Sequence, residues 1–259
     1  MSFILLGILN AQALAGAGGG VAGYFGGGNP NTTTVDKFAF PSDSRTTLGT
    51  GLSSATEGLA GMGNSGVAGY FGGGYDGNFT ATVNKFAFPS DSRSTLGTGL
   101  SSTVNKPGGM ANSGVAGYFA GGGNPSNRTT VDKFAFPSDS RSTLGTGLSA
   151  GTVALAGMAD SGVAGYFGGG NASGNVTTVN KFAFPSDSRS SLGTGLTAGV
   201  EGLAAMADSG VAGYFGGGSG AGNVATVDKF AFPSDSRTTL GTGLSSARSS
   251  LAGMEDGGV

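Results

Sequence analysis

The sequence contains no cysteine, no histidine and no tryptophan, and these absences exclude several kinds of site. Without cysteine there are no disulfides and no thiolate chemistry, and without histidine as well the usual Cys/His zinc sites cannot form. Charged residues make up only 11% of the chain and its net charge is −2, so it lacks the basic surface that binds nucleic acid. We therefore expect no metal, no cofactor, no nucleic-acid partner and no enzymatic activity.

The sequence also lacks an apolar run long enough to cross a membrane, which requires about 20 residues. Residues 1–9 are apolar but too short, and they lack the positively charged start of a secretory signal peptide. Residues 11–13, Ala-Gln-Ala, loosely resemble a cleavage site, so a signal peptide is the alternative. We interpret residues 1–17 as an apolar docking segment and expect no membrane span.

Glycine, by contrast, is abundant, at 55 of 259 residues, and its placement is periodic. The motif Gly-Tyr-Phe occurs five times, with three glycines after it directly or, in the third unit, after Ala120. The arginines of five Ser-Asp-Ser-Arg segments keep a period of 48 (Arg45, Arg93, Arg141, Arg189, Arg237). Fifteen of the seventeen phenylalanines occupy repeat positions, as a repeated packed core requires. These patterns predict one array of five units over residues 18–259, and about 40–50 residues is the size of a propeller blade.

Each unit contains four short segments with the character of β-strands. In the second unit they are expected at Leu59–Met62, Val67–Phe71, Thr82–Phe88 and Ser94–Thr98. The third alternates, which places its two phenylalanines on one face, and the Pro-Ser-Asp-Ser segment after it has the composition of a turn. No segment has helical periodicity. Four antiparallel strands per unit, repeated radially, predict an all-β, five-bladed β-propeller.

Two segments are candidates for the strand that closes the ring. We expect Leu251–Met254 to close it by pairing with Val21–Phe25 of the first unit, which would remove open sheet edges. The alternative is that Leu14–Ala17 takes this place and the C-terminal strand continues into a partner.

The units resemble the kelch repeat. A strand ending in glycines, an aromatic strand, a Pro/Asp turn and a strand of small residues follow in kelch order, and Ser245–Ala252 is kelch-like in its Ala-Arg followed by small residues. The tryptophan that often follows the turn in kelch units is missing, and a leucine lies near that point. Whole repeats are also similar to those in structural proteins of tailed phages, notably marine cyanophages. The resemblance covers about residues 14–259 and implies a propeller with a role in a virion.

Variation among the units is concentrated in loops that a propeller places on one face, those between strands 2 and 3 and those between blades. The turn between strands 3 and 4 is identical in all five units, whereas every 2–3 loop differs. One of these loops holds two aromatics outside the repeat pattern, and aromatic and arginine side chains dominate interface hot spots. The candidate contact residues are Tyr75, Asp76, Asn78, Phe79, Lys106 and Arg128. The alternative is that this face varies because nothing constrains it.

The charged residues that repeat in every unit are expected to be structural. Asp43 and its copies would cap the turn, while Arg45 and its copies would reach the backbone or a carboxylate of a neighbouring blade. Asp36 and Lys37 are expected on the third strand, with their side chains on alternate faces. An enzyme is disfavoured, because a mechanism without His or Cys needs converging carboxylates and each repeated aspartate already has a structural role.

The leading hypothesis is a non-enzymatic structural or adhesion protein located on a phage virion. Residues 1–17 would attach it to other virion proteins, and the variable face would contact a host surface glycan or a neighbouring protein; homo-oligomerisation stays open. One alternative is a secreted, lectin-like propeller with equivalent sugar pockets between its blades. Another is the repeated shaft of a fibre.

Overall fold

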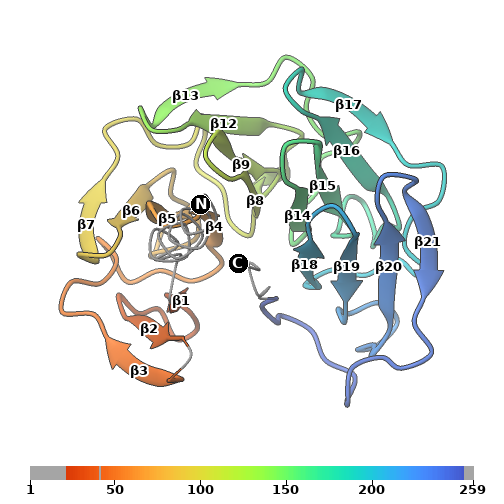
Figure 1. Ribbon diagram of the computed structural model, residues 1–259, viewed down its shortest axis with the longest axis horizontal. Helices are drawn as coiled ribbons and strands as arrows, with labels where there is room; N and C mark the ends of the chain where they lie inside the picture. Colours follow the sequence, from red (N-terminus) through yellow and green to blue (C-terminus); the bar gives the residue numbers. More distant parts are fainter. Residues whose placement is uncertain (1–21, 41, 254–259) are drawn as a thin grey trace, which may run out of the picture.

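The computed structural model describes residues 22–40 and 42–253, and these residues form antiparallel β-sheets and no helix. Five sheets are arranged radially as the blades of a β-propeller (Figure 1). The all-β, five-bladed propeller predicted from the repeats is confirmed. A search of the described residues finds no helix long and apolar enough to span a membrane.

The blades follow one another in chain order, and blades 2–5 each contain four strands. Blade 1 contains β1 (Ala22–Gly26), β2 (Val35–Ala39) and β3 (Ser44–Thr47). Blade 2 contains β4 (Ala60–Asn64), β5 (Ala68–Gly72), β6 (Val83–Ala87) and β7 (Ser92–Thr95). Blade 3 contains β8 (Gly108–Asn112), β9 (Ala116–Ala120), β12 (Val131–Ala135) and β13 (Ser140–Thr143).

The last two blades repeat this pattern. Blade 4 contains β14 (Ala156–Asp160), β15 (Ala164–Gly168), β16 (Val179–Ala183) and β17 (Ser188–Ser191). Blade 5 contains β18 (Ala204–Asp208), β19 (Ala212–Gly216), β20 (Val227–Ala231) and β21 (Ser236–Thr239). Two short strands, β10 (Gly123–Asn124) and β11 (Ser126–Asn127), form a separate hairpin in the loop between β9 and β12.

The expected strands of the second unit correspond to β4–β7, and the fourth differs most from the expectation. It begins at Ser92 rather than Ser94, because the turn before it is tight: the Asp91 amide donates to the Ala87 carbonyl at 2.8 Å, and Asp91 has a φ of 56°. The strand also ends earlier, at Thr95. The edge strand is therefore only four residues long, which limits the open sheet edge that it presents.

The hydrophobic core lies between the blades rather than within them. Between blades 2 and 3, Met62, Tyr70 and Val83 pack with Phe119 and Phe134, and all five side chains are buried. Phe134, a phenylalanine of the third strand, therefore fills part of the space between these two blades.

Repeated glycines make room for these side chains. A Cβ at Gly117 would lie 2.2 Å from the Met62 sulfur, and one at Gly72 would lie 2.8 Å from the Phe119 ring. Glycine and a large side chain therefore face each other across the blade interface. This explains why both recur at fixed positions in each unit.

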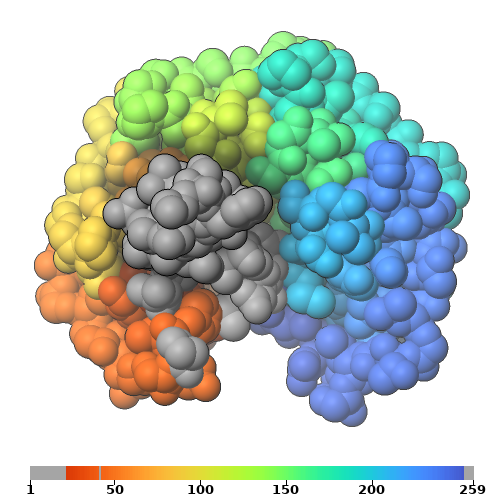
Figure 2. Space-filling view, viewed as in Figure 1, coloured from red at the N-terminus to blue at the C-terminus, as the bar shows by residue number. Residues whose placement is uncertain are grey.

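The two ends of the array are described in part. Among the described residues, β1 pairs only with β2. Leu251–Gly253 form no strand but lie beside β18, since a Cβ added at Gly253 would meet the Ala205 carbonyl oxygen at 2.4 Å. Blade 1 and blade 5 are separated by an opening in the view of Figure 2. Met254 and Val21 of the expected closing pair, the alternative Leu14–Ala17 and the docking segment 1–17 lie outside the described residues.

Candidate binding face

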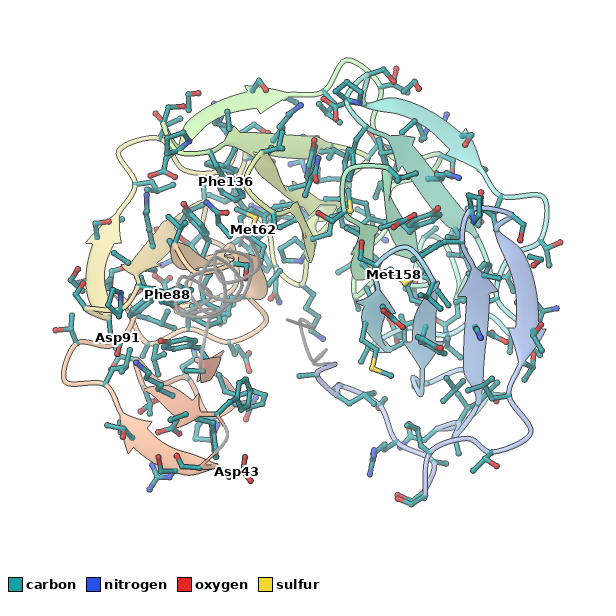
Figure 3. All side chains as sticks on the ribbon, in the orientation of Figure 1. Asp43, Met62, Phe88, Asp91, Phe136 and Met158 are labelled. Atoms are coloured by element: carbon teal, nitrogen blue, oxygen red, sulfur yellow. The ribbon has the colours of Figure 1, made fainter. Side chains whose placement is uncertain are left out.

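A repeated joint between consecutive blades uses most of the recurring charged residues. The Tyr70 hydroxyl donates to Asp139 Oδ1 at 2.8 Å, and Lys85 Nζ lies 2.5 Å from Asp139 Oδ2. The Tyr70 ring also stacks on Phe136, with ring centres 5.4 Å apart. The same four-residue arrangement joins each blade to the next, with the aspartates Asp91, Asp139, Asp187 and Asp235 as acceptors. Figure 3 labels Phe88 and Asp91, which form the blade 2 side of the first such joint.

The joint holds its tyrosines in the neutral form. Burial raises the pKa of Tyr24 to about 12, and the Asp91 carboxylate that accepts its hydroxyl adds to the shift. The pKa values of Tyr70, Tyr118 and Tyr166 are also raised, first by burial and then by their aspartate partners. The hydroxyls of these four tyrosines are therefore protonated and act as hydrogen-bond donors between blades.

The expected role of the repeated aspartate is corrected in part by this geometry. Asp91 lies in the turn with positive φ, as expected of a turn residue, but its carboxylate accepts from Tyr24 and Lys37 of the preceding blade. Its side chain therefore links blades. Lys37 lies on β2, which is the counterpart in blade 1 of the third strand of each later blade, as expected. Its hydrogen bond with Asp91 raises the pKa of the lysine.

The repeated arginine stays mainly within its own blade, which corrects the expectation that it reaches a neighbouring one. Arg45 donates to Asp36 on the adjacent strand at 3.0 Å, and Arg237 makes the equivalent contact with Asp228 at 3.3 Å. Strand register explains this, because Arg45 pairs with Phe38 and so lies diagonally across from Asp36. Burial by itself would raise the pKa of Asp228, but the hydrogen bonds from Thr197, Thr239 and Arg237 together outweigh it, and the pKa is lowered.

The variable loops are joined to one another by backbone hydrogen bonds. In blades 2–5, the 2–3 loop forms a β-bridge with the segment that precedes its blade, such as Glu57 with Tyr75 and Asn105 with Gly123. A second set of backbone hydrogen bonds joins the segments that precede consecutive blades. In the series Ser250, Gly202, Ala154, Lys106 and Gly58, the amide of each residue donates to the carbonyl of the next. The two kinds of variable loop therefore lie on one face, as the propeller topology predicts.

The loop of blade 2, residues 73–82, differs from the others in a specific way. Asn31, Asn127 and Asn175 occupy equivalent positions in three other blades, and each donates its side-chain amide to the next loop along the ring. Blade 2 has Phe79 at this position. Phe79 is 38% exposed and packs edge-on against Tyr75, with ring centres 5.6 Å apart. An aromatic pair thus replaces a link that three other loops use.

Polar groups surround this aromatic pair. Asp76 and Asn78 lie between Tyr75 and Phe79 in the sequence, and both are exposed. Asp76 Oδ2 accepts a hydrogen bond from Ser54 Oγ at 3.0 Å. The Tyr75 amide donates to the carbonyl of Glu57, and the next residue, Gly58, accepts from the Lys106 amide at 2.7 Å. Lys106 is exposed and has a φ of 53°, which is uncommon for a residue with a side chain.

The six candidate residues are therefore not all equivalent. Tyr75, Asp76, Asn78 and Phe79 share one loop, and this loop pairs with the segment that contains Glu57 and Gly58. Lys106 is joined to that segment by the hydrogen bond from its amide to the Gly58 carbonyl. Arg128 belongs to the next loop, and its guanidinium donates to the Asn124 carbonyl at 2.8 Å within that loop. The geometry groups the first five and gives Arg128 a role in its own loop.

Glu57 is a residue of this site that the sequence argument missed. Its backbone pairs with Tyr75, and its Oε2 accepts a hydrogen bond from the Asn29 side chain at 2.6 Å. The signal was present in the repeats, because Glu57, Asn105, Val153 and Glu201 each precede their bridge partner by the same number of residues. Phe79 is exposed and Tyr75 is half-buried, and this aromatic pair, with carboxylates, an amide and a lysine in the same group of loops, is suited to stacking on a sugar ring and hydrogen bonding its hydroxyls.

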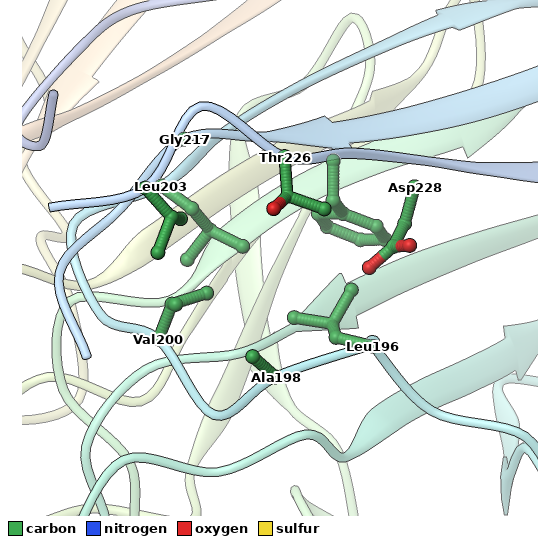
Figure 4. A pocket seen from close by; sticks show the side chains of 9 residues that line it. Leu196, Ala198, Val200, Leu203, Gly217, Thr226 and Asp228 are labelled. Atoms are coloured by element: carbon green, nitrogen blue, oxygen red, sulfur yellow. The ribbon is translucent and has the colours of Figure 1, made fainter. Parts of the chain in front are cut away.

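The cavities between blades are small. The one between blades 4 and 5, shown in Figure 4, has a volume of about 10 Å³ and is lined by Leu196, Val200, Leu203, Phe215 and Asp228, among others. An equivalent cavity between blades 2 and 3 is of the same size. About 10–15 Å³ is the room that one water needs. In the residues that the structure describes, no three Asp or Glu side chains gather as a metal site would require.

Comparison with known proteins supports the fold. No protein-family model matches this sequence, and no curated protein matches it. Among solved structures, the chain is similar to the one titled "Structure of YjhT", with a TM-score of 0.72 and 15% sequence identity over 90% of this chain and 84% of that chain. At this level of identity the likeness shows that the chain has a β-propeller fold.

Proposed function

We propose that this protein is a non-enzymatic adhesion module that binds a surface glycan through the blade 2 loop and its neighbour Lys106. The observation that carries the proposal is the contrast between one loop and the rest: blade 2 exposes Phe79 against Tyr75, where three other blades have an asparagine that links the loops. Exposed aromatic side chains of this kind often anchor an interface. The rest of the scaffold is repeated from blade to blade.

A display role on a phage virion remains part of the proposal and rests on the resemblance of the repeats. The lectin-like alternative with equivalent pockets in every blade is less well supported. At the position of Tyr75 the next three blades have Gly123, Asn171 and Ser219, and the two cavities between blades described above have room for about one water each. A single binding site per chain fits these observations better than a repeated one.

A non-enzymatic role is proposed because the repeated carboxylates are engaged in the scaffold. The aspartates of the turns bind tyrosine and lysine, and Asp132 and Asp228 on the third strands accept from Ser101 and Thr197 of the preceding blade. Carboxylates that accept these hydrogen bonds are occupied by the scaffold, which argues against their use as an acid–base pair.

The test is a glycan array and whole-cell binding with three chains. In the first variant, residues 75–79 (Tyr-Asp-Gly-Asn-Phe) are replaced by Asn-Ala-Ser-Gly-Asn, the sequence of residues 171–175, which occupies the same loop positions in blade 4. The matched control is Val115→Ala, at an exposed residue in the turn between β8 and β9. We expect the wild type and the control to bind the same glycans and the loop variant to lose binding. Equal binding by all three, or no glycan binding by the wild type, would refute the proposal.

A further inference from the structure

One position on the third strand alternates between aspartate and asparagine along the array. Blades 1, 3 and 5 have an aspartate there (Asp36, Asp132, Asp228), and blades 2 and 4 have an asparagine (Asn84, Asn180). The arginine diagonally across from this position, on the outer strand, is present in every blade. Alternate blades therefore have the same cation with and without a neighbouring carboxylate.

In blade 3, the carboxylate of Asp132 is the acceptor for a set of four donors. Its Oδ2 accepts from the amide and the hydroxyl of Ser101, in the segment before the blade, at 2.8 and 2.9 Å. Its Oδ1 accepts from Thr143 Oγ1 at 2.7 Å and from the Arg141 guanidinium at 3.5 Å. Asp228, labelled in Figure 4, has the same role in blade 5. The surrounding groups are therefore arranged to bind an oxyanion.

In blade 2, the side-chain amide of Asn84 does not replace that carboxylate. Its single oxygen accepts from the Ser53 amide, Thr95 Oγ1 and the Arg93 guanidinium at 3.2, 3.3 and 3.4 Å. Its Nδ2 is itself a donor, so it cannot accept from the Ser53 hydroxyl as a carboxylate oxygen would. In the part of the chain that is described, neither Nδ2 nor this hydroxyl has a hydrogen-bond partner. Two donors are therefore unused.

The charge of Arg93 has no counterion among the described residues. Arg141 forms an ion pair with Asp132, whereas Arg93 donates only to neutral side chains. The aspartate nearest to it in sequence, Asp91, is engaged in the joint with blade 1. Arg93 is half-buried, and removing a cation from water is costly unless an anion pairs with it. Blade 2 therefore presents a positive charge and two unused donors around one asparagine.

Blade 4 repeats this arrangement. The Ser149 amide donates to Asn180 Oδ1 at 3.1 Å, and Arg189 donates to Ser191 Oγ at 3.2 Å. Within the described residues, Arg189 forms no ion pair, and Asn180 Nδ2 and the Ser149 hydroxyl have no partner. Ser149 is exposed, as Ser53 is in blade 2. The arginines lie on β7 and β17, which are the outermost strands of their blades (Figure 1). Both sites are therefore at the rim of the propeller.

We propose that the rims of blades 2 and 4 each bind an oxyanion, such as a sulfate or carboxylate group. Arg93 and Ser53 bind it in blade 2, and Arg189 and Ser149 bind it in blade 4. The guanidinium supplies the charge and the hydroxyl a further hydrogen bond, and such charge-assisted bonds are stronger than neutral ones. The anion thus takes the part that an internal carboxylate has in blades 3 and 5. These sites share no residue with the proposed glycan site and do not depend on it.

An NMR titration of the full chain with sodium sulfate, at constant ionic strength, tests this. The backbone amide signals of Ser53 and Ser149 should shift and saturate. Those of Ser101 and Thr197, which occupy the same position beside a carboxylate, should not, and they serve as controls within the same molecule. Asn84→Asp gives blade 2 the residue that blade 3 has. It should weaken sulfate binding at Ser53 by about tenfold or more and leave the Ser149 response unchanged.

Two further arms complete the test. Arg93→Gln removes the charge and should have the same effect as Asn84→Asp, and the retained Ser149 response shows that each variant is folded. A sulfated oligosaccharide that binds at least tenfold more tightly than inorganic sulfate would identify the anion as a group on a polymer, whereas equal affinity would identify a free ion. The proposal is overturned if Ser53 and Ser149 show no saturable shift, if all four amides shift alike, or if Asn84→Asp leaves the Ser53 response unchanged.

Discussion

The joint between blades 3 and 4 makes a quantitative prediction for Tyr118→Phe. The Tyr118 side chain is about 1% exposed, and its hydroxyl donates to Asp187 Oδ1 at 2.8 Å. The substitution removes only this oxygen and leaves the ring stacked on Phe184. A hydrogen bond to a charged acceptor contributes about 1.5–3 kcal/mol, so we expect the free energy of unfolding to fall by about that amount.

The assay is urea-induced unfolding, with Tyr75→Phe as the matched control. The Tyr75 hydroxyl has no hydrogen bond to the described residues, so its removal should change the free energy of unfolding by less than about 0.5 kcal/mol. In thermal unfolding, the loss at Tyr118 corresponds to a shift of roughly 3–12 °C for a domain of about this size. If Tyr118→Phe unfolds like the control, the hydrogen bond between Tyr118 and Asp187 does not stabilise the propeller.

A cycle with Asp187→Asn separates the pair from its surroundings. Asparagine keeps the shape of the side chain and accepts the φ of 55° at this position, but it loses the charge that Lys133 binds at 2.6 Å. We expect the two substitutions to be non-additive by more than about 0.5 kcal/mol, as for residues in one network. Additive effects would show that the hydroxyl and the carboxylate act independently.

Three further predictions concern glycine, pH and the variable loop. Gly147→Ala should destabilise the protein by about 1–3 kcal/mol in urea unfolding, because its Cβ would lie 2.1 Å from the Thr129 carbonyl oxygen, whereas Gly145→Ala, with open space around it, should be nearly neutral. Because folding raises the pKa of Tyr24, Tyr70, Tyr118 and Tyr166 above 10.0, their contribution to stability is full below pH 10 and is lost as the pH rises further; tyrosinate absorbance should show these groups ionising late, and four normal titrations in the folded protein would contradict this. Phe79→Asn should keep or raise the unfolding temperature, because it restores the amide that links three other loops to the next blade, while abolishing glycan binding; a variant that still binds would contradict the assignment.

The repeats were sufficient to predict the fold because periodicity carries the strand pattern and the core together. The alternation in residues 82–88 predicted that Phe86 and Phe88 share a face, and they pack toward blade 1, Phe86 in its hydrophobic cluster and Phe88 on Tyr24. The partners of charged side chains were harder to predict. Nothing local to Asp91 shows that its carboxylate meets Tyr24 and Lys37, because that contact depends on how two sheets sit against each other.

The candidate site could be predicted only as a loop. The sequence identifies Tyr75 and Phe79 as departures from the repeat, and the structure shows them in contact. The sequence could not show that the Arg128 guanidinium donates to the Asn124 carbonyl, or that Glu57 pairs with Tyr75, because both contacts depend on loop geometry.

The most direct test of the account is a crystal structure of the protein with the glycan that binds best on the array. The account predicts a sugar ring against Tyr75 and Phe79, with its hydroxyls bonded to Asp76 or Asn78 and with Lys106 within reach. A sugar bound between blades, on the opposite face or at equivalent positions in every blade would contradict it.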